Sequence, residues 1–197
     1  MPSASDLRPV PLVELIDGMS RRRRVGVALG RVLDRMPWAA RVARAPMRLG
    51  PVVTRVTRLH ALLLRLSGGR LRRSWLFAAG QPVLSLTTTG RRSSLPRTTT
   101  VACFRFEGQL ATAAMNLGKE RDPAWALNLQ ADPRATVVVA GRAIDVLARR
   151  LAGDEAVRAW GRWRELQPSA DAFRALAGRE IPLFVLESRD VLGTHLT

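Results

Sequence analysis

The sequence predicts an α+β protein in which antiparallel strands form a barrel and helices are inserted between the paired strands. Three observations support this fold class. The helical spacing of apolar residues changes to strand-like alternation at about Gln81. The strand-like segments beyond it are paired by short turns, which suit antiparallel rather than parallel neighbours. The 197 residues, 47% hydrophobic and 24% charged, are also sufficient to bury a globular core.

Residues 1–50 are expected to form a basic, proline-interrupted helical extension, and residues 51–197 the barrel domain. Apolar residues recur at helical spacing over 20–36 and again over 52–66, with arginines on another face. Three interpretations of this basic region stay open. Its helices pack on the barrel, lie on an anionic membrane surface through residues 20–66, or attract nucleic acid by charge. No recognition motif accompanies them, so no specific nucleic-acid partner is expected.

The predicted barrel begins with three strands in a meander. Alternating and β-branched residues indicate strands over 82–89, 97–106 and 109–115. The segment 90–96 contains glycine and proline and predicts the first turn, and Glu107–Gly108 predicts a tight second turn. Because the turns are short, consecutive strands are expected to be antiparallel neighbours.

Helices and strands alternate over the remainder of the chain. The acidic residues Asp154 and Glu155 suit the start of a helix, where the helix dipole favours negative charge. The predicted elements are a short helix between Pro123 and Pro133, a hairpin of strands 135–141 and 142–151 about Gly141, helices over 153–167 and 170–177, and a buried strand over 181–187.

Charge and cysteine content restrict the function. The formal net charge is +16, and Lys119 is the only lysine, so nearly all of the positive charge is arginine. Guanidinium groups bind phosphate and carboxylate at two points, which favours an anionic ligand. Cys103 is the only cysteine and is expected to be a small core residue. It cannot form a disulfide within the chain, which favours a reducing cytoplasm, with the inner face of the cell membrane as an additional location.

Several function classes lack support in the sequence. No apolar run reaches the roughly 18 residues of a membrane span. No cluster of metal ligands is visible, so no metal is expected. The motifs of serine hydrolases, dinucleotide-binding folds and nucleotide triphosphatases are missing from the sequence.

The stretch "LTTTGRRSSLPRTTT", residues 86–100, concentrates hydroxyl and guanidinium groups around one turn. Gly90 permits positive φ and close approach of a ligand. Backbone N–H groups at such a turn can form a concave anion nest. Local chemistry leaves two interpretations open, an anion site and an ordinary hairpin with a solvated, charged tip.

Several stretches, in order along the chain, are similar to the deazaflavin-dependent nitroreductase family. "LTTTGRRS…PRTTT" resembles the family motif T-T-G-R-[KR]-[ST]-G-x-P-R. "AAMNLGKERDPAWALNL" resembles A-S-N/K-G-G-x-x-x-x-P-x-W-Y-x-N-L, and both "NLQADP" before a strand and "REIPLFVLE" near the end also match. The likeness covers about residues 55–190. It implies a split β-barrel of the FMN-binding type that carries the deazaflavin coenzyme F-420, with FMN as the less favoured cofactor.

Coenzyme F-420 bears a phosphodiester and a glutamate tail, so the resemblance explains the charged turn. It assigns residues by motif position. The implied phosphate and tail contacts are Gly90, Arg91, Arg92 and Ser93, and the residues framing the same groove are Pro96, Arg97, Thr98 and Thr99. The segment implied to pass against the ring is Ala113, Ala114, Met115 and Asn116, and the opposite wall is Trp125 and Asn128. The acceptor pocket is assigned to Ala126, Ala170 and Phe173, and charge alone suggests Lys119 and Arg121 for the glutamate tail.

The resemblance implies an oxidoreductase that transfers a hydride from reduced coenzyme F-420 to an electron-poor quinone, enone or nitro compound. The resemblance identifies no side chain as catalytic. A homodimer is one option for the assembly. The chain departs from the family pattern at Ser94, Met115 and Ala126, and it contains no tyrosine. These departures open or depolarise the acceptor pocket, so a non-catalytic module that binds the coenzyme or a similar flat anionic ligand is the alternative.

Overall fold

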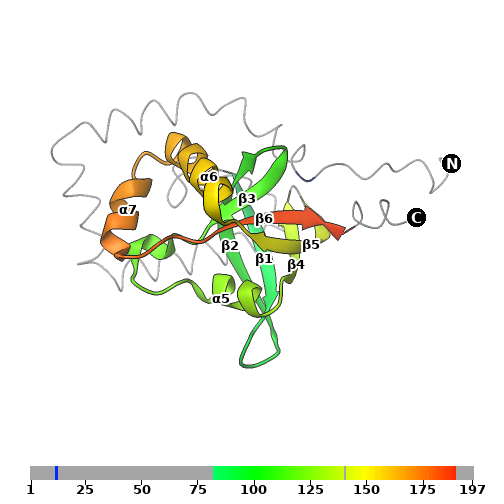
Figure 1. Ribbon diagram of the computed structural model, residues 1–197. Helices are drawn as coiled ribbons and strands as arrows, with labels where there is room; N and C mark the ends of the chain where they lie inside the picture. The colour runs from blue at the N-terminus through cyan, green and yellow to red at the C-terminus, as the bar shows by residue number, and fades with distance from the viewer. Residues whose placement is uncertain (1–11, 13–81, 140, 190–197) are drawn as a thin grey trace.

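A closed, six-stranded antiparallel barrel forms the centre of the protein (Figure 1). The computed structural model describes residues 12, 82–139 and 141–189. The strands are β1 (Val83–Thr89), β2 (Pro96–Phe106), β3 (Gln109–Ala113), β4 (Arg134–Val139), β5 (Arg142–Arg150) and β6 (Leu183–Ser188), and the barrel order is β1-β2-β3-β6-β5-β4. The helices are α5 (Ala124–Ala131), α6 (Gly153–Leu166), α7 (Ala170–Ala177) and the short 3-10 helix η2 (Asn116–Gly118). The predicted α+β split-barrel class is confirmed.

Strand pairing follows the predicted turns. In the first hairpin Thr89 pairs with Pro96, and the pairing continues to Val83 with Ala102. Pairing of β1 with β4 closes the barrel. The third strand is shorter than the predicted range 109–115, since it ends at Ala113. The chain beyond it turns because Asn116 and Leu117 have positive φ, of 45° and 55°, which no strand accommodates.

The barrel interior is filled by the alternate residues of all six strands. Leu84 and Leu86 of β1, Val137 of β4 and Leu186 of β6 belong to this cluster, and each is at most 2% exposed. Leu12, the one described residue of the predicted extension 1–50, is also buried in it. The proposed boundary at residue 50 and the helices over 20–36 and 52–66 otherwise lie outside the described residues, so they stay predictions.

A second apolar cluster lies outside the barrel, beneath α6 and α7. Trp160 and Trp163 of α6 pack on the outward side chains of β2, β3 and β6. The rings of Phe104 and Trp163 have centroids 5.1 Å apart. Strand β6 is therefore covered on both faces, which explains why Leu183, Phe184, Val185 and Leu186 are buried without alternation.

The termini of the helices next to this cluster carry residues that suit those positions. Acidic residues occupy the first turn of α6, and Gly178 ends α7 in the left-handed conformation, with φ of 60°. Over the described ranges, none of the helices has both the length and the hydropathy that crossing a bilayer requires. The predicted membrane-surface role of residues 20–66 concerns residues outside these ranges.

Cys103 is fully buried inside the barrel, as predicted for a core residue. Burial raises the pKa of its thiol to about 12, because a thiolate would lose its hydration there. Its Sγ lies 3.6 Å from the backbone carbonyl oxygen of Pro82. The thiol is therefore protonated and shielded at neutral pH, which excludes it as a nucleophile in the folded state.

We expect no modification of Cys103 by a thiol reagent such as Ellman's reagent in the native protein at pH 8. One thiol per chain should react in denaturant, because unfolding restores both hydration and an ordinary thiol pKa. Absorbance of the released thiolate measures both states. Rapid stoichiometric reaction of the folded protein would contradict the buried position.

Candidate functional site

The β1–β2 turn, residues 90–95, is closed by its own backbone hydrogen bonds. The Gly90 N–H donates to the Leu95 carbonyl at 2.9 Å, and the N–H groups of Ser93 and Ser94 donate to the Gly90 carbonyl at 3.1 and 2.7 Å. The Arg91 N–H donates to the Asn128 side chain at 3.2 Å. The predicted backbone anion nest is therefore corrected, because these N–H groups are used within the chain. Most anion donors at this turn are therefore side chains.

Gly90 is required by close approach rather than by its dihedral angles. A Cβ at this position would lie 2.7 Å from Ser93 Oγ and 3.1 Å from the Leu95 carbonyl oxygen. Gly90 does not use the positive φ that glycine permits; Ser94 takes that conformation instead, with φ of 53°. Ser94 stands where the resembling motif has glycine, so this departure leaves a serine in a backbone conformation that glycine adopts more easily.

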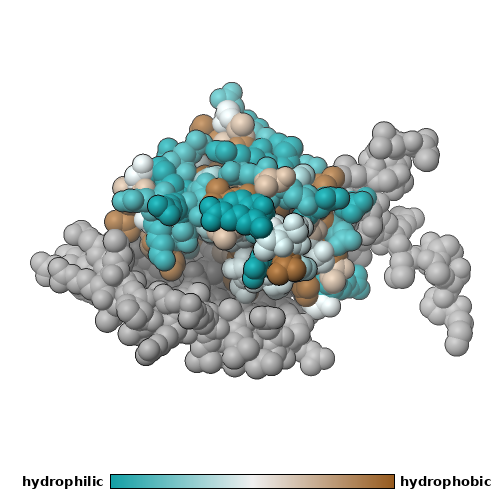
Figure 2. Space-filling model, turned by 90° about the horizontal axis from the view of Figure 1, so that it is seen from below, coloured by the Kyte–Doolittle hydropathy of each residue, from teal (hydrophilic) through white to brown (hydrophobic). Residues whose placement is uncertain are grey.

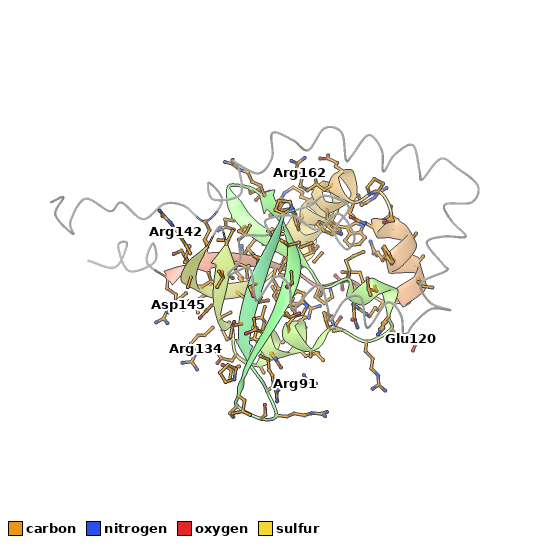
Figure 3. The ribbon with its side chains drawn as sticks, turned by 180° about the vertical axis from the view of Figure 1, so that it is seen from behind. Arg91, Glu120, Arg134, Arg142, Asp145 and Arg162 are labelled. Carbon is orange, nitrogen blue, oxygen red and sulfur yellow. The ribbon has the colours of Figure 1, made fainter. Side chains whose placement is uncertain are left out.

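The side chains of the turn form an exposed cationic surface. Arg91, Arg92 and Arg97 are exposed, and Arg97 Nη2 donates to Ser93 Oγ at 3.3 Å. Within the described part of the chain, Arg91 and Arg92 have no acidic partner. Figure 2 views the protein from the side of this turn and shows mainly hydrophilic side chains there. Figure 3 shows Arg91 at the end of the β1–β2 hairpin.

Other arginines differ from those of the turn, because they pair with carboxylates. Arg149 is held by Glu155, at 2.7 and 2.8 Å, and by Glu187 at 3.3 Å. Among the described residues, the arginines with acidic partners include Arg134, Arg149, Arg158, Arg162, Arg164 and Arg179. Among the residues that the structure describes, Arg91 and Arg92 of the turn thus have no carboxylate that neutralises their charge.

The threonines beside the turn do not share one surface. Thr98 pairs with Thr87, and their hydroxyl oxygens are 2.9 Å apart on the outer face of the sheet. Thr99 pairs with Leu86, whose side chain is inside the barrel. Because neighbouring strand residues point to opposite faces, Thr98 and Thr99 cannot both line one groove from the same side.

Asn128 of α5 connects the helix to the turn. It is only 4% exposed, its Nδ2 donates to Thr88 Oγ1 at 3.0 Å, and its Oδ1 accepts the Arg91 N–H. Thr88 is 2% exposed, and its hydroxyl lies 3.5 Å from the Arg97 carbonyl oxygen. The amide assigned to a coenzyme wall is therefore occupied by the protein, and the structure places Asn128 as a support of the arginine turn.

The segment assigned to the coenzyme ring forms a tight loop after β3. Ala114 is buried, Ala113, Met115 and Asn116 are half-buried, and Asn116 Nδ2 donates to the Arg121 carbonyl at 2.7 Å. Asn116, Leu117 and Gly118 all have positive φ. Gly118 faces α7, where an added Cβ would lie 2.8 Å from Leu176 Cδ2 and 3.2 Å from Phe173 Cδ1.

The residues assigned to the acceptor pocket are unequally accessible. Ala126 and Ala170 have no exposed surface, and they belong to the barrel core and the outer cluster respectively. Phe173 is half-buried against the loop after β3. Trp125 is half-buried, with its ring 5.8 Å from that of Phe184 in an edge-on arrangement. Of the predicted acceptor residues, only Phe173 therefore has surface to offer.

Arg179 was not singled out by sequence reasoning, although it begins the "REIPLFVLE" stretch. Its guanidinium forms an ion pair with Asp122 and donates to the carbonyls of Ala114 at 3.1 Å and Lys119 at 3.2 Å. It therefore holds the loop that carries the predicted ring-contacting residues. A composition-based search could not have found it, since the partners are mostly backbone carbonyls.

The barrel and its helices define a split β-barrel protein of the flavin- and deazaflavin-binding class. The chain belongs to the F420H(2)-dependent quinone reductase family, whose model matches residues 56–188. It is therefore an oxidoreductase that depends on coenzyme F-420.

Known relatives are similar over most of the chain. Two proteins of Mycobacterium tuberculosis, from strains H37Rv and CDC 1551, are named F420H(2)-dependent quinone reductases. Each is 28% identical to this chain over 141 residues, which cover 70% of this chain and 93% of the relative. A solved structure described as F420-H2 dependent reductase FDR-A aligns with a TM-score of 0.49 and 29% identity, over 54% of this chain and 94% of that chain.

We expect Asn128→Ala to lower the free energy of unfolding by about 1–3 kcal/mol, because it removes the donor to the buried Thr88 hydroxyl and leaves the Arg91 N–H without its partner. Thr88→Val tests the same link, and the double variant should show non-additive losses. Gln130→Ala, at an exposed position of α5, is the control and should change stability by less than about 0.5 kcal/mol. Urea denaturation measures all four proteins, and strictly additive effects would contradict the bridge.

Proposed function

We propose that the protein transfers a hydride from reduced coenzyme F-420 to an electron-poor acceptor of the quinone type, with enones and nitro compounds as further acceptors. The observation that carries the proposal is the exposed cationic turn, whose Arg91 and Arg92 have no acidic partner among the described residues. Arg91 and Arg92 are exposed side by side on a backbone that the buried Asn128 holds in place. Such a pair suits the phosphodiester and carboxylates of the coenzyme.

The chemistry of the donor set fits the coenzyme. Its phosphodiester and glutamate tail are acceptor-only groups, and Arg91, Arg92 and Arg97 are donor-only groups. Ser93 adds a hydroxyl that is already within 3.3 Å of Arg97 Nη2. Lys119 and Arg121 are exposed in the loop after β3, where they would add positive charge for the tail. Five cationic side chains thus come from two segments, the β1–β2 hairpin and the loop after β3.

The protein's own contribution would be binding and orientation. When bound, coenzyme F-420 supplies two electrons as a hydride from its ring carbon. Arg91, Arg92 and Arg97 would hold its anionic end, and Ala113–Asn116 would lie along its ring with small side chains at the point of closest approach. Fixing donor and acceptor in near-attack geometry is worth up to about 7–11 kcal/mol of the barrier. The chain has no tyrosine, so we propose water as the proton source for the product anion.

A second candidate is a non-catalytic binding module. It is favoured by the acceptor side, where Ala126 and Ala170 have no exposed surface and phenol groups are missing from the sequence. In this case the turn would retain the coenzyme while nothing positions an acceptor. Binding and turnover must therefore be measured separately.

We expect the double variant Arg91→Ala/Arg92→Ala to weaken coenzyme binding by about 2–5 kcal/mol, because two charge-assisted hydrogen bonds are lost. The matched control is Arg142→Ala/Arg150→Ala, which removes the same charge from exposed positions of β5. Figure 3 shows that Arg142 lies well away from Arg91. Quenching of tryptophan fluorescence at moderate salt measures the affinity. Equal affinity of the two double variants would contradict the assignment of the turn.

We expect reduced coenzyme F-420 mixed with the protein and menadione to return to its oxidised absorbance at a rate proportional to protein concentration. An enone and a nitroaromatic compound, tested in the same way, define the acceptor class. Tight binding with no acceptor-dependent oxidation would favour the binding module over the enzyme.

A further inference from the structure

We propose that Arg179 is a positioning residue, which sets the conformation of the loop 114–122 against the coenzyme ring. This inference rests on the proposed function. Arg179 follows Gly178, which ends α7, and precedes strand β6. It therefore joins the helix beside the loop to the barrel, although it is remote from the loop in sequence.

The contacts of Arg179 are concentrated on this loop. Its Nη2 donates to the carbonyls of Ala114 at 3.1 Å and Arg121 at 3.4 Å, and its Nε donates to the Lys119 carbonyl at 3.2 Å. Its Nη1 pairs with the Asp122 carboxylate and donates to the Glu180 carbonyl at 3.0 Å. One guanidinium thus holds the start, the middle and the end of the loop.

This cluster differs from the surface ion pairs of the protein by its burial. The Arg179 side chain is 16% exposed and the Asp122 side chain 19%. By comparison, the Arg158–Glu107 pair has side chains 56% and 51% exposed. A partly buried pair that also satisfies backbone carbonyls is costly to break, whereas an exposed pair contributes little.

The backbone inside the loop explains why such a clamp is needed. Asn116 and Leu117 are non-glycine residues with positive φ, and Leu117 is 45% exposed, so packing does not offset its strain. L-residues other than glycine are less stable in this backbone conformation. Asn116 Nδ2 closes the loop on the Arg121 carbonyl, which Arg179 also contacts. The strained residues directly follow Ala114 and Met115, which are assigned to the ring.

A lysine could not substitute for this arginine. Lysine has three donors on a single nitrogen, whereas the planar guanidinium presents five in fixed directions. The contacts of Arg179 use all three of its nitrogens. Arg179→Lys should therefore retain the charge beside Asp122 and release part of the loop.

The test compares Arg179→Lys and Asp122→Asn with Arg149→Lys. Arg149 also has several partners, Glu155 and Glu187, but lies outside the loop and the turn. Without coenzyme, hydrogen–deuterium exchange of residues 113–122 should rise at least tenfold in the first two variants, with the β1–β2 turn unchanged. With oxidised coenzyme F-420, induced circular dichroism of the ring should fall by half or more, while the dissociation constant changes less than threefold.

Single-turnover oxidation of the reduced coenzyme by menadione should slow tenfold or more in these two variants and stay within twofold in Arg149→Lys. Asp122→Asn keeps the test decisive if Arg179→Lys does not fold. The positioning role would be overturned if both loop variants showed the dichroism and the rate of the wild type. The proposed function would stay intact in that case, provided that the wild type binds the coenzyme and turns it over. Failure of the wild type to bind the coenzyme would overturn both.

Discussion

The proposed site depends on one buried carboxamide. Asn128 donates to Thr88 and accepts from the Arg91 N–H, so a single side chain ties α5 to β1 and to the turn beyond it. The other N–H groups that close the turn, those of Gly90, Ser93 and Ser94, are donated to carbonyls of the turn itself. Most N–H groups of the turn are thus used within the chain, and its guanidinium groups extend from a backbone that Asn128 anchors to the core. This arrangement suits a ligand held by charge, because the donors need not reorganise the main chain when the ligand arrives.

The described arginines have two different roles. Some arginines join elements of the fold, as Arg149 does between β5, α6 and β6, where it also holds the pKa of Glu155 below its usual range. At the turn, Arg91 and Arg92 have no such carboxylates among the described residues. A net charge of +16 would attract any polyanion weakly. The exposed arginines of the turn thus offer local positive charge at the end of the β1–β2 hairpin, as the proposed function requires.

The strands of the barrel could be predicted because the alternation of apolar residues and the choice of turn residues depend on the local environment of each residue. The strands from Val83 to Ala113 and the Gly178 cap follow directly from such patterns. The supports of the site were not predictable in the same way. The sequence does not show whether the Asn128 side chain contacts a ligand or the Arg91 N–H. Only the fold brings Asn128 Nδ2 to 3.0 Å from Thr88 Oγ1. Arg179 binds carbonyls, which every residue has, so its partners leave no mark in the sequence. Positive φ at Leu117 is not predictable from the sequence either, because leucine rarely adopts it.

Asn128 and Arg179 each hold a segment that is connected to α5. Asn128 fixes the turn from the C-terminal half of the helix, while the loop that Arg179 clamps leads into its first residue, Ala124. In the proposed function the turn faces the anionic end of the coenzyme, while the loop faces the ring and adds Lys119 and Arg121 for the tail. Affinity would then depend chiefly on the turn, and the alignment of the ring on the loop. A barrel built in this way can alter its acceptor side, as the buried Ala126 and the missing tyrosines indicate, without losing the coenzyme, because the two tasks rest on different side chains.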